Sequence, residues 1–155
     1  MRFTVERVAF LDAISRLQKV VGAKSSMPVL EGVLISAEQG LLTMAAYNLE
    51  MGMKKEIYAK CDEAGDIVIN ARLLADILRR LNGLQVEIQT DAKLNCHIKC
   101  GGATFDIMGM AATDFPEMPD MKWAVVNTND CPTTYDVCTN LRTAIRYWLW
   151  HLGIP

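Results

Sequence analysis

The stretch FLDAISRL, residues 10–17, has a close copy in LADILRRL, residues 74–81. The two stretches lie 64 residues apart, from Phe10 to Leu74, and correspond at apolar and charged positions alike. The matched pairs are Phe10 with Leu74, Asp12 with Asp76, Ile14 with Leu78, Arg16 with Arg80, and Leu17 with Leu81. Apolar residues at three- and four-residue steps predict an amphipathic helix in each stretch.

The segments around the two helices repeat in the same order. RFTVE, residues 2–6, and DIVIN, residues 66–70, precede the helices and alternate as half-buried strands do. Strands are predicted after the first helix at residues 29–37, 41–46 and 49–59, and after the second at 85–90, 94–100 and 103–110. Two β-α-β-β-β units predict one α+β domain with an internal pseudo-two-fold axis, its two helices adjacent and its sheets behind them.

The ends of the helices and the join between the units are also predicted. Gly22 and Gly83 are expected to end the two helices, and Asn70 is expected to cap the second. The charged segment CDEAGD, residues 61–66, is expected to be a loop.

Composition places the chain among globular proteins. Its 155 residues suit one domain, and 51% hydrophobic with 22% charged residues disfavours disorder. MRFTVER lacks the apolar core of a secretory signal, and no apolar run approaches the roughly 18 to 20 residues of a membrane span. We therefore expect a cytoplasmic protein with no membrane partner. Five cysteines in no paired pattern indicate reduced thiols.

Charge is distributed unevenly along the chain. A net charge of −2 argues against a broadly basic protein that coats nucleic acid. The helical segments are nonetheless cationic, +1 over residues 8–21 and +2 over residues 71–82. Their basic residues are Arg16, Lys19, Arg72, Arg79 and Arg80. The alternative is a solvated face on which Asp12–Arg16 and Asp76–Arg80 pair, each worth about 0.2 to 0.5 kcal/mol.

Five stretches in one order carry a family resemblance. They are MRFTVER (1–7), MPVLEGVLI (27–35), NLEMGM (48–53), INARLLADILRRL (69–81) and ATDFPEMPD (112–120). Over residues 1–120 the chain resembles the first domain of the bacterial DNA polymerase III beta subunit, the sliding clamp. The resemblance implies the DNA clamp fold and a ring of six such domains, with sheets outside and paired helices around duplex DNA. It also implies a non-enzymatic processivity factor, without cofactor, that tethers DNA polymerase III.

The resemblance assigns roles to particular residues. Arg16, Lys19, Arg72, Arg79 and Arg80 suit sequence-independent contacts with DNA phosphates. Lys24 matches the position of a basic residue that touches DNA in the family; the alternative is an ordinary loop lysine. At Tyr47 and Asn48 the chain departs from the family's usual Thr-Asp.

Ring closure in the family pairs an edge strand of the first domain with the other subunit. Here that edge would be residues 103–110, with Phe105 and Ile107 at the interface; the alternative is that both belong to the core. An unpaired edge also favours self-association. The family's pocket for peptides of the polymerase and the clamp loader lies in its second and third domains.

Residues 121–155 match nothing in the family pattern. All three tryptophans fall in this segment, and a divergent tail from truncation or a frameshift is one hypothesis. The alternative function is an isolated clamp-fold domain that acts as a protein interaction module, or a fragment without function.

CHIKC, residues 96–100, suggests a metal site at first. On a strand, however, Cys96 and Cys100 share one face while His97 points to the other, so three ligands do not converge. We expect no metal, no cofactor and no catalytic residue.

Overall fold

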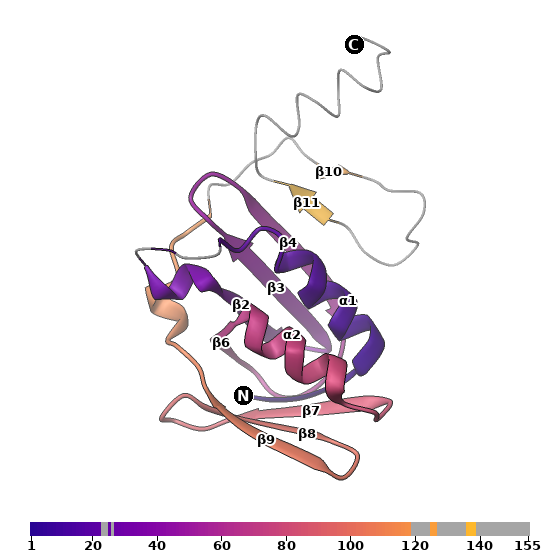
Figure 1. Cartoon of the computed structure of the whole chain (residues 1–155). Coiled ribbons are helices and arrows are strands. Elements are labelled where there is room, and N and C mark those ends of the chain that lie inside the picture. The colour runs from indigo at the N-terminus through magenta and orange to yellow at the C-terminus, as the bar shows by residue number, and fades with distance from the viewer. Residues whose placement is uncertain (23–24, 26, 119–124, 127–135, 139–155) are drawn as a thin grey trace.

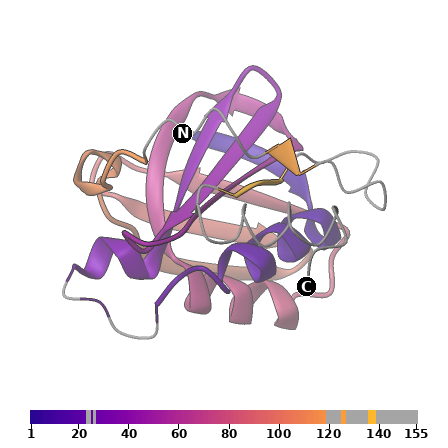
Figure 2. The same cartoon turned by 90° about the horizontal axis from the view of Figure 1, so that it is seen from above.

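Two helices lie side by side on one side of two β-sheets in the structure of this chain, a computed structural model (Figure 1). The same arrangement is visible from above, where both helices line one side of the strands (Figure 2). The structure describes residues 1–22, 25, 27–118, 125–126 and 136–138. The adjacent pair of helices predicted from the repeat is therefore confirmed.

The repeated order of elements is present as predicted. The first unit holds β1 (Arg2–Glu6), α1 (Arg7–Leu17), β2 (Gly32–Glu38), β3 (Leu41–Tyr47) and β4 (Gly52–Tyr58). The second holds β6 (Gly65–Asn70), α2 (Ala71–Arg80), β7 (Gln85–Thr90), β8 (Asn95–Cys100) and β9 (Ala103–Met108). The remaining elements are β5 (Lys60–Glu63), β10 (Val125–Val126), β11 (Asp136–Cys138) and two 3₁₀ helices, η1 (Pro28–Glu31) and η2 (Ala112–Asp114).

Each unit gives its first strand to the sheet of the other unit. The first sheet has the order β5-β1-β7-β8-β9, so β1 of the first unit lies beside the three strands of the second. The second sheet has the order β10-β11-β4-β3-β2-β6, so β6 of the second unit lies beside the three strands of the first. All of these pairings are antiparallel. This reciprocal exchange is the structural form of the pseudo-two-fold axis.

The larger of two hydrophobic clusters fills the space between the helices and the sheets. Phe3 of β1 and Phe10 of α1 are fully buried and pack edge to face, with ring centroids 6.2 Å apart. Leu74 and Leu78 of α2 are fully buried in the same cluster. Apolar residues at helical spacing on each helix thus fix which sides of the helices remain outside.

The loop predicted at residues 61–66 is wrong, because β5 covers residues 61–63 and β6 already begins at Gly65. β5 pairs with β1 at the edge of the first sheet. Its acidic side chains face cations: Asp62 lies 4.0 Å from Arg2, and Glu63 lies 3.6 Å from the amino terminus. Charge at an edge strand is well tolerated, which is why a charged sequence did not exclude a strand.

Two predicted strand boundaries also need correction. The strand expected over residues 29–37 begins only at Gly32, because Pro28 starts a 3₁₀ helix whose Val29 and Leu30 are buried. β4 begins at Gly52, after Leu49 adopts a positive φ of 70° in a turn.

The helices end earlier than their glycines suggest. α1 ends at Leu17, well before Gly22, and α2 ends at Arg80, where Leu81 already has an extended backbone. Gly83 serves a different purpose, since a Cβ there would lie 2.5 Å from the Cys100 sulfur. The absence of a side chain at Gly83 lets its backbone pass close to Cys100 of β8.

Candidate nucleic-acid interface

Helix α2 is oriented by its amino-terminal cap and its buried side. The Asn70 side-chain oxygen accepts a hydrogen bond from the Leu73 backbone N–H at 3.1 Å, so the predicted cap is confirmed. The buried residues of the helix are Ala71, Leu74, Ala75, Ile77 and Leu78. Arg72, Arg79 and Arg80 are exposed as a consequence.

Helix α1 runs antiparallel to α2 and is fastened to it at one end. The Arg7 guanidinium at the start of α1 donates to the carbonyl of Gly83 at 2.9 Å and to that of Leu78 at 3.4 Å, both near the end of α2. The buried residues of α1 are Phe10, Ala13, Ile14 and Leu17. Burial of that stripe leaves Arg16 half-buried and Lys19 exposed on the other side.

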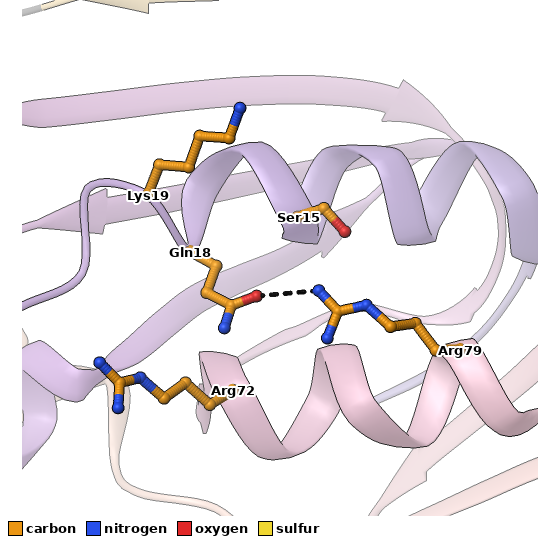
Figure 3. Close-up of a pocket in the computed structure, with 5 residues that line it drawn as sticks. All are labelled: Ser15, Gln18, Lys19, Arg72 and Arg79. Atoms are coloured by element: carbon orange, nitrogen blue, oxygen red, sulfur yellow. Dashed lines mark hydrogen bonds between the residues drawn. The ribbon is translucent and has the colours of Figure 1, made fainter. Parts of the chain in front are cut away.

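The outer surfaces of the two helices meet in a shallow hollow. Ser15, Gln18 and Lys19 line it from α1 and the turn after it, and Arg72 and Arg79 line it from α2 (Figure 3). The Gln18 side-chain oxygen accepts a hydrogen bond from Arg79 across the hollow at 3.3 Å. Of the five cationic residues predicted on the helical segments, Lys19, Arg72 and Arg79 are thus brought together.

The ion pairs on this surface differ in part from those predicted. Asp12 pairs with Arg16 at 3.0 Å, as expected for an i,i+4 pair. The predicted partner of Asp76 is wrong: the carboxylate pairs with Arg79 at 2.7 Å and not with Arg80. An i,i+3 contact is as accessible on a helix as i,i+4, and Arg79 also reaches Gln18 on that side. Among the described residues no ion pair involves Lys19, Arg72 or Arg80.

A buried lysine that the sequence analysis missed joins β4 to α1. Lys55 of β4 has a side chain only 2% exposed, and its ammonium lies 2.9 Å from the Asp12 carboxylate. Burial raises the pKa of Asp12, but the hydrogen bonds from Lys55 and Arg16 outweigh it and hold that pKa below 3.8. The signal that could have revealed it is strand alternation, which places Lys55 on the same face of β4 as the apolar Met53 and Ile57.

The β9 edge holds the two residues predicted at a ring interface. β9 is the outermost strand of the first sheet. Phe105 and Ile107 lie opposite Ile98 and Cys96, so both side chains are on the core face of the sheet. Phe105 is still 37% exposed, whereas Ile107 is partly buried and packs on the core. At this edge a side chain can therefore pack on the core and still expose surface to a neighbouring subunit.

Comparison with known proteins agrees with this arrangement. Residues 1–119 match the family described as DNA polymerase III beta subunit, N-terminal domain. The chain belongs to the DNA polymerase III beta subunit family. The beta sliding clamp of Micrococcus luteus is 34% identical over 121 residues, which cover 78% of this chain and 39% of that relative. The beta sliding clamp of Streptomyces coelicolor is 31% identical over 121 residues, covering 78% and 32%.

Solved structures of the beta subunit family share the fold. Caulobacter crescentus pol III beta superposes with a TM-score of 0.73 at 33% identity, covering 77% of this chain and 32% of that one. A putative DNA polymerase III beta subunit from Eubacterium rectale gives 0.76 at 28% identity, covering 80% and 34%. The fold is the α+β DNA clamp fold. This chain spans about a third of the length of the beta subunit relatives that it matches.

Two expectations drawn from the beta subunit family fall outside the described residues. Lys24, expected at the DNA surface, is one of them. The segment 121–155 is described only at β10 and β11, and β11 pairs with β4 at the edge of the second sheet.

The remaining sequence expectations concern metals and membranes. Cys96 and Cys100 are buried on the core face of β8, and His97 faces the opposite side, where its ring bonds to Asp106 at 2.5 Å. The three side chains therefore do not converge, as beta-sheet alternation predicted. Neither α1 nor α2, the α-helices of the described part, has the length and apolar character to cross a membrane.

Proposed function

We propose that this chain is a sliding-clamp component whose helix pair faces duplex DNA. In this proposal the clamp encircles DNA and tethers DNA polymerase III, so that release of the polymerase does not end synthesis. The chain contributes no catalytic residue and no cofactor to that task. Its place of action is the cytoplasm, and the polymerase and the clamp loader are partners of the complete clamp.

The observation that carries the proposal is the meeting on one surface of cationic side chains from α2 and from the turn that follows α1. Lys19, Arg72 and Arg79 line one hollow, and Arg80 is exposed one position further along α2. The chain as a whole has a net charge of −2, so this surface is cationic against an anionic background. Such local charge attracts a polyanion without making the whole protein adhere to it.

The chemistry of these groups suits a clamp that slides. Contacts between guanidinium or ammonium groups and phosphates do not depend on base sequence. Their strength falls as the salt concentration rises, because binding releases counterions from the DNA. Arg16 and Arg79 are already bonded to carboxylates, which weakens their attraction for phosphates. A surface with few unshielded cations holds DNA loosely and permits movement along it.

The edge of β9 is the proposed site of ring closure. A strand of a neighbouring subunit would add to β9 by backbone hydrogen bonds, and Phe105 and Ile107 would pack against that subunit. The exposed part of Phe105 supports this role.

A second candidate function is a protein interaction module that no longer acts on DNA. It is favoured by one observation: among the described strands, β9 has β8 as a neighbour on one side only. A free edge recruits partners whether or not a ring forms.

Retention on DNA separates the two functions. The full chain is incubated with covalently closed circular DNA and isolated by gel filtration, then compared with the same DNA after linearisation. A ring is retained on circles and lost from linear ends. Retention that does not depend on topology, or no retention at all, leaves only the interaction module.

Charge reversal tests the DNA-facing surface directly. Arg72→Glu with Arg80→Glu should abolish duplex binding, because two attractive groups become repulsive. Lys99→Glu is the control for a single reversal and is compared with Arg72→Glu alone, since Lys99 is exposed on β8 between the buried Ile98 and Cys100 and so faces away from the helices. Binding that survives the double reversal but not the control would place the DNA on another face.

A further inference from the structure

Gln18 is a neutral side chain in the hollow between the two helices. It lies there with Ser15 and Lys19 on the α1 side and with Arg72 and Arg79 on the α2 side (Figure 3). A count of basic residues omits it, because an amide carries no charge. An amide nevertheless has two N–H donors and an oxygen acceptor, and glutamine is among the side chains that donate to DNA phosphates.

Arg79 determines which way this amide faces. The Gln18 oxygen accepts a hydrogen bond from Arg79 at 3.3 Å. A guanidinium has no acceptor, so only the oxygen of the amide can bond to it. The Gln18 nitrogen consequently points away from Arg79 (Figure 3). Within the described part of the chain this nitrogen has no hydrogen-bond partner, so both of its N–H groups are left for an acceptor from outside.

Both partners of this hydrogen bond are held in place. Arg79 also donates to the Asp76 carboxylate at 2.7 Å, three residues earlier on α2. The turn that follows Gln18 is fixed by a hydrogen bond from the Asn48 side chain to the Val20 carbonyl at 2.9 Å. The amide therefore projects from an anchored backbone toward an anchored guanidinium. A group ordered in this way loses little conformational freedom when it binds a ligand.

The neighbours of the amide indicate the class of ligand. Lys19 and Arg72 line the same hollow, and neither has an ion pair among the residues that the structure describes. An anion attracted by these two cations meets the N–H groups of Gln18 in the same place. A phosphate of the DNA backbone accepts from charged and neutral donors alike.

We propose that Gln18 is a DNA-contact residue, which donates from its amide nitrogen to a backbone phosphate while Arg79, as a positioning residue, holds its oxygen. This inference rests on the proposed function, in which the helix pair faces duplex DNA. Lys19 and Arg72 supply attraction that falls with salt. Gln18 adds a hydrogen bond that displaces no counterion.

Salt dependence separates a neutral donor from a cation. Duplex binding by the full chain is measured by fluorescence anisotropy at several salt concentrations. Gln18→Met should weaken binding about three- to tenfold, as expected for one lost hydrogen bond, and leave the slope of log Kd against log salt unchanged. Lys19→Met removes a charge and should lower that slope by about 0.9. Unchanged binding by Gln18→Met, or a slope lowered as in Lys19→Met, overturns the proposal.

The matched control is Gln89→Met. Gln89 is exposed on β7 next to the buried Ile88, so its side chain lies on the face of the sheet away from the helices. The chemical change is the same as in Gln18→Met, and binding should equal that of wild type. Equal losses for the two glutamine variants contradict a contact at Gln18.

A double-mutant cycle tests the part played by Arg79. Arg79→Met removes a cation in every background, but it removes the orienting hydrogen bond only where Gln18 is present. The variant should therefore weaken binding at least about twofold more in wild type than in the Gln18→Met background. An equal effect in both backgrounds overturns the positioning role of Arg79.

Nuclear magnetic resonance separates contact with DNA from a purely structural role. A Gln18 that only joined the two helices would also lose binding when replaced, but its amide protons would not respond to DNA. In proton–nitrogen correlation spectra of wild type, the side-chain signal of Gln18 should move downfield on addition of duplex, and should move less in Arg79→Met. The measurement on wild type does not require any Gln18 variant to fold. Absence of the shift overturns the proposal.

The reversal of Arg72 and Arg80 distinguishes the two levels of inference. If it abolishes binding while Gln18→Met binds like Gln89→Met, only the role of Gln18 is wrong. If it leaves binding unchanged, or if wild type binds no duplex, the proposed function fails and the role of Gln18 fails with it.

Discussion

The Arg7 guanidinium joins the beginning of one helix to the end of the other, with its Nε 2.9 Å from the Gly83 carbonyl oxygen. A second nitrogen donates to Leu78 at 3.4 Å, so one partly buried side chain supplies donors to two carbonyls near the end of α2. The link fixes the relative position of the helices on which the cationic surface depends.

Replacing Arg7 should therefore destabilise the domain. Arg7→Met keeps most of the apolar stem but removes both hydrogen bonds, and we expect a loss of about 1.5 to 3 kcal/mol in the free energy of unfolding. Urea denaturation followed by circular dichroism measures it. Arg2→Met is the control: Arg2 is exposed and pairs with Glu87, so its loss should cost less than about 1 kcal/mol. Equal costs for the two variants would contradict the bridging role.

Gly83→Ala should destabilise the domain by steric conflict. The new Cβ would lie 2.5 Å from the Cys100 sulfur and 3.2 Å from the Gly101 nitrogen, so the strand must shift, at about 1 to 3 kcal/mol. Thermal unfolding measures the loss. Gly102→Ala is the matched control, because a Cβ there meets no atom within 4 Å. Shortening the neighbour by Cys100→Ala should relieve part of the loss, and a full loss in that background would point to another cause.

Asp12 should make stability fall in acid. Its folded pKa is lowered, since the hydrogen bonds from Lys55 and Arg16 outweigh the effect of burial, so the unfolded chain binds the proton more tightly. The stabilisation is complete above the ordinary value of 3.8 and is lost as pH falls through the folded pKa. The difference in unfolding free energy between wild type and Asp12→Asn should be constant from pH 7 to about 5 and shrink below about 4. A difference that is independent of pH down to about 2 would exclude this linkage.

Cys96 should be chemically inert in the folded protein. Burial, with a smaller contribution from the charge of Asp106, raises the pKa of its thiol to about 12. Because the thiolate is the reactive form, iodoacetamide at pH 8 should modify Cys96 far more slowly than the partly exposed Cys61. Peptide mass spectrometry follows both sites separately. Unfolding in urea should make the two rates similar, and similar rates without urea would contradict the burial of Cys96.

Much of the fold was predictable because it depends on periodicity. The apolar spacing of FLDAISRL and LADILRRL predicted both helices, and the repeat predicted their adjacency. The exchange of first strands was not predictable in the same way, since alternation indicates which side of a strand is buried and not which strand lies beside it. β5 was missed because its side chains are charged, while its pairing with β1 depends on the backbone.

The site was predicted in part for similar reasons. Exposure of Arg72, Arg79 and Arg80 followed from the buried stripe of α2. The buried Lys55 did not follow, because lysine is almost never fully buried and its partner is 43 residues away. The choice of Arg79 over Arg80 by Asp76 depends on side-chain geometry that a helical spacing leaves open.

The exchange of β1 and β6 between the two sheets has a consequence for folding during synthesis. Arg2–Glu6 leaves the ribosome long before Gln85–Thr90, the strand that must lie next to it, and so waits without that neighbour. The first half alone would lack β6, the edge strand of its sheet, and would contain β1, whose sheet is formed by the second half. We therefore expect neither half to be a folding unit by itself, and the two to gain their structure in a single cooperative step once almost the whole domain has emerged.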